Sequence, residues 1–263
     1  MNRTLRIGLT LLSLFLLQNI DIGQCQQTRT KAEIVSAFTG RSPKEWGVRV
    51  TGVRTRLKTD QKVLALTFDA CGGIRGTGYD ARLIEYLKNQ NLPATLFISG
   101  RWIRANGAIF NELVSHPLFE IENHGLNHKP CSVNGRSAHG IKGTGSVAEL
   151  VDEIEGNAIK IEELTGRRPR YYRPGTSYCD EIGVEVARAL GYEVVSFSLP
   201  GDGGATYSKD QVKNALLRAP ASSIILMHMN HPEGETAEGL MAAIPELRKR
   251  GFRFARLLEY DLR

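Results

Sequence analysis

Two histidines four residues apart, together with a carboxylate far upstream in the chain, could bind a divalent metal ion. His124 and His128 have a spacing that would place both imidazoles on one face of a helical turn. Asp69 ends an apolar run and precedes a glycine-rich stretch, so its carboxylate is a candidate metal ligand or base. Two imidazoles and one carboxylate leave a position open for water, whose pKa a bound Zn²⁺ ion lowers to about 7. The pattern therefore predicts metal-assisted hydrolysis.

Three further polar residues are candidates for proton transfer or for positioning a catalytic group. His228 ends a strongly apolar run, where it could serve as a general acid. Arg173 could orient Asp69 and lower the pKa of its carboxyl group. Asp202 lies in a glycine-rich loop, where it either orients the His228 ring or only begins a turn.

The other three histidines lack such a setting. His231 follows His228 by three residues in a predicted turn, so we expect it at the rim of the site. His116 and His139 have no comparable neighbours, and we expect both to be structural.

The candidate residues lie at or just after the ends of apolar, strand-like runs, of which there are seven. The runs are 63–68, 94–98, 118–121, 170–173, 193–197, 222–227 and 252–257. Helix-like stretches separate them, the clearest being 147–164, whose apolar residues recur with a 3.6-residue period. Other helices are expected to begin near Asp80, Trp102, Asp180, Asp210 and Thr236.

This alternation predicts an α/β fold with parallel strands and outer helices, as either a doubly wound sheet or a (β/α) barrel. The number of strand-like runs, about seven, favours the barrel. In both architectures the loops that follow the strands form the active site. The candidate carboxylates, histidines and arginine are therefore expected to share one face of the molecule.

The composition is that of a folded protein and gives no reason to expect a nucleic-acid partner. The chain has 263 residues, of which 41% are hydrophobic, enough for one sizeable core. The 34 basic and 28 acidic residues give a net charge of +6, but they are interspersed and form no long basic run.

The first 25 residues differ in character from the rest of the chain. Arg3 and Arg6 precede the apolar run 7–17, which is typical of a signal peptide and too short for a membrane-spanning helix. We therefore expect residues 1–25 to be a signal peptide, residues 26–61 a lead-in segment and residues 62–263 the catalytic domain. The mature protein is expected to be exported to the periplasm, cell envelope or medium, without a stable membrane span.

Export would place three cysteines of the mature chain in an oxidising compartment. Cys131 and Cys179 occupy loops that leave consecutive predicted strands, so we expect a disulfide between them, with Cys71 free. A Cys71–Cys131 bridge is the main alternative. A further alternative is that the Cys71 thiolate is a metal ligand.

Four short motifs, in this order along residues 62–257, resemble those of polysaccharide deacetylases with a NodB homology domain, carbohydrate esterase family 4. They are Thr67-Phe68-Asp69, the His124/His128 pair, Arg173-Pro174-Gly175 and Leu226-Met227-His228. The resemblance implies a distorted (β/α) barrel with about seven strands and a divalent metal, usually zinc. It also implies removal of acetyl groups from N-acetylglucosamine polymers such as peptidoglycan, chitin-like chains or an exopolysaccharide.

The chain departs from the family pattern at the first motif. Family members commonly carry two adjacent aspartates there, the first a base and the second a metal ligand, whereas this chain has Ala70 at the second position. Either Asp69 ligates the metal itself or another group, such as Asp80, replaces the missing ligand. The segment 125–127 lacks the hydroxyl residue common in the family, and Asp202 lacks the usual neighbouring tryptophan.

We expect a polysaccharide N-deacetylase in which His124, His128 and Asp69 bind the metal. Asp69 also serves as base, and His228 protonates the leaving amine. Arg173 and Asp202 position these two catalytic groups. Two alternatives remain open: a hydrolase of a non-peptide C–N bond in a non-sugar amide, and a catalytically silent carbohydrate-binding protein, which Ala70 suggests.

Overall fold

The computed structural model describes residues 29–263, so the predicted signal peptide lies outside the described residues. The helices are α1 (Lys31–Phe38), α2 (Ala81–Asn89), α3 (Gly100–Ala105), α4 (Gly107–Ser115), α5 (Val147–Thr165), α6 (Glu181–Ala189), α7 (Lys209–Leu217) and α8 (Thr236–Lys249), with 3₁₀ turns η1 (Gly175–Ser177) and η2 (Leu257–Glu259). The strands are β1 (Val63–Ala70), β2 (Ala94–Ile98), β3 (Phe119–Asn123), β4 (Ser137–Ala138), β5 (Ile141–Lys142), β6 (Tyr171–Tyr172), β7 (Glu193–Val194), β8 (Leu199–Pro200), β9 (Ile224–His228) and β10 (Arg253–Ala255).

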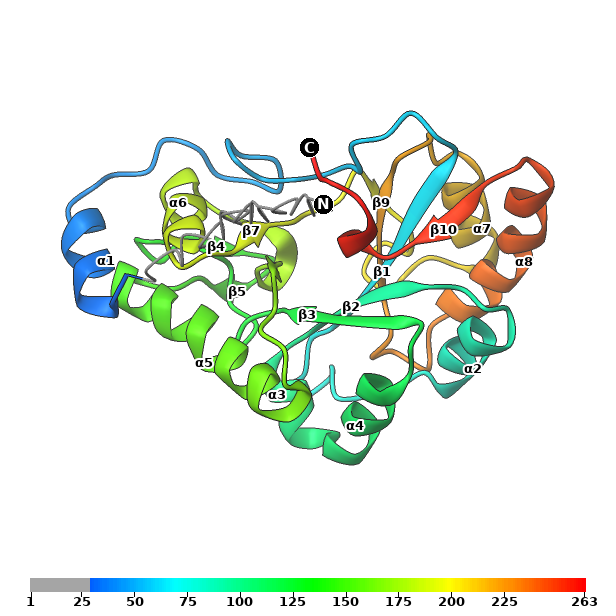
Figure 1. Ribbon diagram of the computed structural model, residues 1–263, viewed down its shortest axis with the longest axis horizontal. Coiled ribbons are helices and arrows are strands. Elements are labelled where there is room, and N and C mark those ends of the chain that lie inside the picture. The colour runs from blue at the N-terminus through cyan, green and yellow to red at the C-terminus, as the bar shows by residue number, and fades with distance from the viewer. Residues whose placement is uncertain (1–28) are drawn as a thin grey trace, which may run out of the picture.

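The main sheet is parallel and curled, as predicted for a distorted (β/α) barrel. Its order is β7-β6-β3-β2-β1-β9-β8, and β10 pairs with β1. All seven predicted strands are present. The eighth strand, β8, has two residues and includes a proline, so no apolar run marked it in the sequence. Helices line the outside of the curled sheet from α1, α5 and α6 on one side to α7 and α8 on the other (Figure 1).

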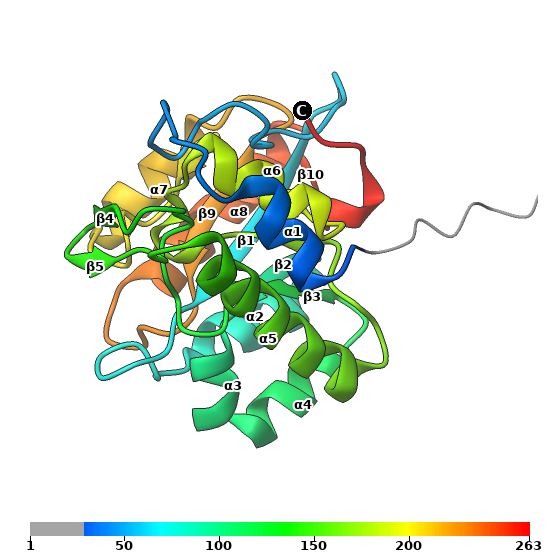
Figure 2. The same ribbon diagram turned by 90° about the vertical axis from the view of Figure 1, so that its left-hand side faces the viewer.

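Most helices begin where the sequence placed them. Asp80 and Asp180 are the N-caps of α2 and α6, each accepting a hydrogen bond from a backbone N–H three residues further on. Helix α5 begins after the N-cap Ser146 and ends at Gly166, whose φ of 70° is a left-handed conformation that glycine adopts readily. Its buried residues belong to the same apolar cluster as those of α1 and α6. The three helices lie on one side of the molecule (Figure 2).

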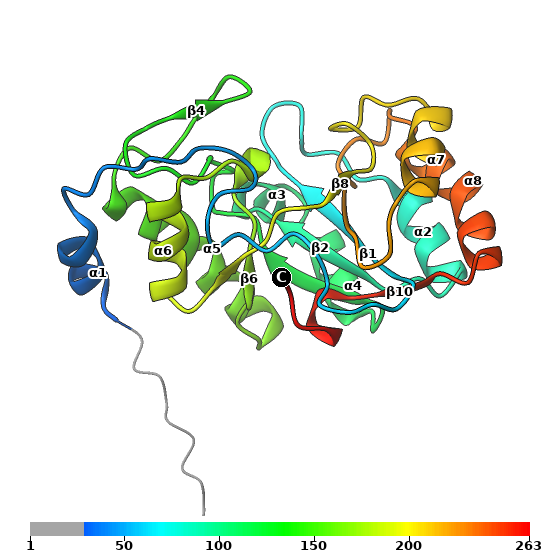
Figure 3. The ribbon, with the colours of Figure 1, turned by 90° about the horizontal axis from the view of Figure 1, so that it is seen from above.

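The lead-in segment is bound to the barrel. Helix α1 contributes Ile34 and Phe38 to the same apolar cluster as α5 and α6. Further along, the Arg54 N–H donates to the Val194 carbonyl, and the Ser196 N–H donates to the Arg54 carbonyl, both over 2.8 Å. This segment therefore runs beside the edge strand β7, and Figure 3 shows it crossing the molecule above the strands.

Two carboxyl groups of one strand are buried inside the barrel. Glu120 and Glu122 both lie on β3, and each has one side-chain oxygen without a hydrogen-bond partner among the described residues. Burial raises the pKa of Glu120 to about 7 and, with the help of Glu120, that of Glu122 to about 8. The other Glu120 oxygen accepts a hydrogen bond from the Leu258 N–H and so links η2 to β3.

The Glu120→Gln variant should gain stability over wild type as pH rises. The folded protein keeps Glu120 protonated up to about pH 7, whereas the unfolded chain ionises it near its ordinary value of 4.5. The wild-type free energy of unfolding therefore falls over that interval, and the variant should exceed it by on the order of 3 kcal/mol at alkaline pH. Urea unfolding at two pH values measures the difference, with the exposed Glu163→Gln on α5 as the control. An equal gain at acid and alkaline pH would contradict the assignment.

Candidate active site

The carboxyl ends of β1, β3, β6 and β9 meet beside a groove of about 490 Å³. The loop after β1 and the β4–β5 hairpin extend on this side of the molecule (Figure 3). The lining includes four of the polar residues at strand ends, Asp69, Cys71, His128 and His228, and also His139 and Tyr178. The expectation that the strand-end residues share one face is met.

Asp69 is held by Arg173, which follows β6. Arg173 Nη1 donates to Asp69 Oδ1 over 2.7 Å, and its Nη2 donates to the Ser196 carbonyl over 3.0 Å. The guanidinium is fully buried and lies 4.0 Å above the Phe97 ring. Burial lowers the pKa of Arg173, and the Asp69 carboxylate opposes that shift. One Asp69 oxygen is thus fixed, while Oδ2 lies 3.5 Å from His124 Nε2.

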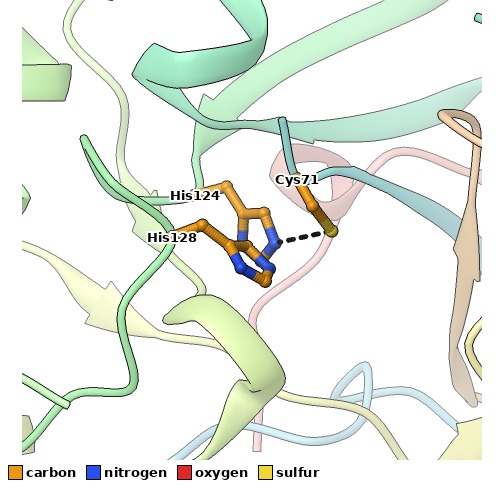
Figure 4. Close-up of side chains that lie close together, drawn as sticks. All are labelled: Cys71, His124 and His128. Carbon is orange, nitrogen blue, oxygen red and sulfur yellow. Dashed lines mark hydrogen bonds between the residues drawn. The ribbon is translucent and has the colours of Figure 1, made fainter. Parts of the chain in front are cut away.

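His124, His128 and Cys71 form a cluster of metal-ligand type (Figure 4). His124 Nδ1 lies 2.8 Å from the Arg173 carbonyl, which accepts its proton and leaves Nε2 free to bind a metal. Nε2 is 3.9 Å from Cys71 Sγ, and the two imidazole rings are 4.8 Å apart. Within residues 29–263, one ligand atom from each of these three residues lies within 4.8 Å of the other two.

The two histidines lie in an irregular, bent loop, and the predicted helical turn is wrong. Gly125 and His128 have φ of 78° and 59°, which are left-handed, so the loop cannot continue as a helix. Glu153 on α5 holds it by accepting the backbone N–H groups of Asn127 and Lys129. A Cβ on residue 125 would lie 2.5 Å from Glu153 Oε1. The positive φ and this close approach therefore favour glycine at this position.

His228 is paired with Asp202. The Asp202 carboxylate accepts the His228 backbone N–H over 2.6 Å and lies 3.0 Å from His228 Nδ1. The hydroxyl of Thr236 and the N–H of Gly204 also donate to it. Burial acts to lower the pKa of His228, but the Asp202 carboxylate overcomes it and holds that pKa well above its ordinary value. This arrangement favours a protonated His228 at neutral pH.

Two residues of the site were missed or misjudged from the sequence. Glu153 was not considered, although its spacing from Leu150 and Asn157 places it on the buried side of α5. His139 was predicted to be structural, but it lines the groove and packs edge-on against Tyr178 with ring centroids 5.4 Å apart. The short β4–β5 hairpin that carries His139 gave no apolar signal.

The remaining candidates lie outside the cluster. Asp80, considered as a replacement ligand, caps α2. His116 packs against Phe119 near the start of β3. His231 lies beside His228, with ring centroids 6.4 Å apart, and pairs with Glu233.

The predicted disulfide is wrong for this structure, in which Cys71, Cys131 and Cys179 are all free thiols. The two loops do meet as expected, because Cys131 and Cys179 are backbone bridge partners. However, the Cys179 thiol donates to the Gly47 carbonyl over 3.6 Å. Burial raises the pKa of both Cys131 and Cys179, which disfavours the reactive thiolate form.

Comparison with known families decides which group of proteins this is. The polysaccharide deacetylase family model matches residues 56–195, just over half of the chain. The chain belongs to the polysaccharide deacetylase family. The match confirms the family and the class of enzyme that the four motifs indicated, hydrolases of carbon–nitrogen bonds in acetylated polysaccharides.

Two relatives of the family are similar to this chain over most of their own length. A peptidoglycan-N-acetylglucosamine deacetylase from Bacillus cereus is 24% identical over 211 residues, which cover 79% of this chain and 92% of that protein. An acetyl xylan esterase of family 4 from Clostridium thermocellum, solved with a cobalt ion, has a TM-score of 0.60 at 25% identity and covers 75% of this chain and 89% of its own.

A family pseudoenzyme is also similar in structure. The wild-type BA3943 protein from Bacillus anthracis has a TM-score of 0.65 at 24% identity, covering 78% of this chain and 67% of that chain. Fold alone therefore does not separate active from inactive members.

Within residues 29–263, no helix combines the length and the apolar character needed to cross a membrane.

Proposed function

We propose that this protein is a metal-dependent N-deacetylase acting on a polymer that contains N-acetylglucosamine. One observation carries the proposal: two hydrogen-bonded pairs lie beside the His124/His128 loop. In one pair Arg173 holds Asp69, and in the other Asp202 holds His228. A bound divalent ion, with Zn²⁺ the best match for imidazole ligands, would polarise the acetyl carbonyl and lower the pKa of water.

Two side chains of the protein, Asp69 and His228, transfer the protons. Asp69, oriented by Arg173, accepts a proton from the attacking water through its free Oδ2, which faces the His124 ring. As the bond between the acetyl carbon and the nitrogen breaks, His228 gives its Nε2 proton to the leaving amine. Asp202 holds the other ring nitrogen and stabilises the imidazolium form. The products are acetate and a free amino sugar.

The groove supports a sugar polymer as substrate. Its lining includes Tyr178, whose ring packs against His139 and Trp46, with centroids 5.4 Å and 5.8 Å away. Aromatic rings with a polar edge suit sugars, which have apolar ring faces and polar rims. The signal-peptide pattern of residues 1–25 supports a polymer outside the cytoplasm.

A silent carbohydrate-binding protein is the second candidate, favoured by Ala70 and by the structural likeness to the pseudoenzyme. Against it, the groups proposed as base and acid are both present with their buried partners. A catalytic role for Asp69 gives a reason for burying the Arg173–Asp69 pair, whose desolvation is costly.

Acetate release from different acetamides separates the candidates. The zinc-loaded protein should deacetylate N-acetylglucosamine oligomers with a kcat/KM at least about 10²-fold above that for a small non-sugar acetamide, because contacts remote from the reacting bond contribute to transition-state binding. Equal values for both substrates would favour the non-sugar amidase. Tight binding of the oligomer without acetate release would favour the silent protein.

A further inference from the structure

We propose that the Cys71 thiolate is the third protein ligand of the metal, in place of the carboxylate that Ala70 cannot provide. Asp69 is thereby left free to act as base. This inference rests on the proposed metal-dependent function. It changes the ligand set from two imidazoles and a carboxylate to two imidazoles and a thiolate.

The direction of the side chains at the end of β1 supports this assignment. Successive residues of a strand face opposite sides of a sheet, so Asp69 and Ala70, the last two residues of β1, point in opposite directions. Asp69 and Cys71 both line the groove. Ala70 is instead fully buried in the apolar cluster that contains Trp102 of α3. Of the two residues that follow Asp69, the one placed to approach the histidines is therefore Cys71.

The distances fit a shared ion. Cys71 Sγ lies 3.9 Å from His124 Nε2, and His128 completes a set with ligand atoms within 4.8 Å of one another. A tetrahedral zinc ion with ordinary Zn–S and Zn–N bonds holds sulfur and nitrogen roughly 3.6 Å apart. Only a small movement would therefore bring Cys71 and His124 to bonding distance of one ion.

The backbone around Cys71 fixes its position. The Cys71 carbonyl accepts the Ser99 hydroxyl over 2.6 Å. Gly72 follows with φ of 72°, and a Cβ there would lie 2.6 Å from the Trp102 nitrogen, so the chain turns sharply where only glycine fits. The thiol is thus presented by a rigid turn, as a ligand position requires.

Asp69 is less suited to the same position. Its Oδ1 is engaged by Arg173 over 2.7 Å. Among the described residues, the set of mutually close ligand atoms contains Cys71, His124 and His128 but not Asp69. A set with one thiolate and two imidazoles favours Zn²⁺ and Co²⁺ over the harder Mg²⁺ and Mn²⁺.

Cobalt spectroscopy tests the sulfur ligand without relying on activity. Full-length apoprotein titrated with Co²⁺ should develop a near-ultraviolet sulfur-to-cobalt charge-transfer band that saturates at one ion per chain. Cys71→Ala should lose the band and bind the metal more than about 100-fold more weakly, because even outer-shell partners contribute 10- to 100-fold. Cys71→Asp, which restores an oxygen ligand at the same position, should retain bound Co²⁺ without the band.

Alkylation of the wild-type protein gives a second readout that needs no variant. Iodoacetamide should modify Cys71 in the apoprotein, and saturating Zn²⁺ should suppress that modification, as measured by peptide mapping. Cys131 and Cys179 are fully buried and serve as internal controls for unfolding.

The outcomes separate this inference from the proposed function. If Co²⁺ binds in a manner that depends on His124 and His128, but gives no charge-transfer band and leaves Cys71 equally reactive, Cys71 is not a ligand and the metal-dependent function stands. If the folded wild-type protein binds neither Co²⁺ nor Zn²⁺, both proposals fail.

Discussion

Replacing His124 and His128 by alanine should abolish the binding of divalent metal and lower the rate of acetate release by roughly 10³-fold or more. Both imidazoles come from one loop and form a ligand set with Cys71, and His124 Nε2 faces Cys71 Sγ and Asp69 Oδ2. A Lewis acid that contributes several kcal/mol to the transition state corresponds to a factor of that size. Metal analysis of the purified variants measures the first effect.

The control for this experiment is His231→Ala. His231 lies beside His228 but pairs with Glu233 outside the cluster, so its loss should leave the metal content unchanged. Circular dichroism checks that the double variant is folded, because the His124 side chain is fully buried. Full metal occupancy in the folded double variant would overturn the assignment of the histidines.

Asp69→Asn and His228→Ala should each lower kcat by roughly 10²- to 10⁴-fold while the metal stays bound, since both remove a group that transfers a proton. Asparagine keeps an oxygen for the Arg173 hydrogen bond but cannot accept the proton of water. In His228→Ala, the buried Asp202 keeps its hydrogen bonds from Thr236, Gly204 and the backbone of residue 228. Both variants should therefore fold.

The metal content of Asp69→Asn gives this second experiment a sharper result. Retained metal agrees with a base supported by Arg173 and a sulfur ligand from Cys71. Loss of metal would instead identify Asp69 as a ligand, the alternative that the sequence left open. Near-normal turnover of His228→Ala on an acetylated oligomer would place the proton donor elsewhere.

The sequence predicted the parts of the site that depend on strand ends. Asp69, Arg173 and His228 follow buried apolar runs, and the parallel sheet brings such ends together. For Asp202 the sequence allowed two interpretations, pairing with His228 or the start of a turn. The path of a glycine-rich loop cannot be predicted from its sequence. The helix starts at Asp80 and Asp180 could be predicted from the sequence, because side-chain capping is a local interaction.

Features of the site that depend on contacts between segments far apart in the chain could not be predicted from the sequence. The non-helical His124–His128 loop is held by Glu153, which lies on a helix 25 or more residues away in the chain. His139 reaches the groove on a hairpin of two-residue strands, too short to show alternation. Cys131 and Cys179 were correctly placed side by side, yet the direction of each thiol depends on packing that spacing does not encode.

The most direct test of metal-dependent deacetylation is acetate release from an N-acetylglucosamine oligomer before and after metal removal. The purified protein should release acetate, lose that activity on treatment with a chelator, and regain it on addition of one equivalent of Zn²⁺, with Asp69→Asn inactive throughout. Acetate release that persists in the metal-free protein, or its absence from folded, zinc-loaded wild type, would contradict the account.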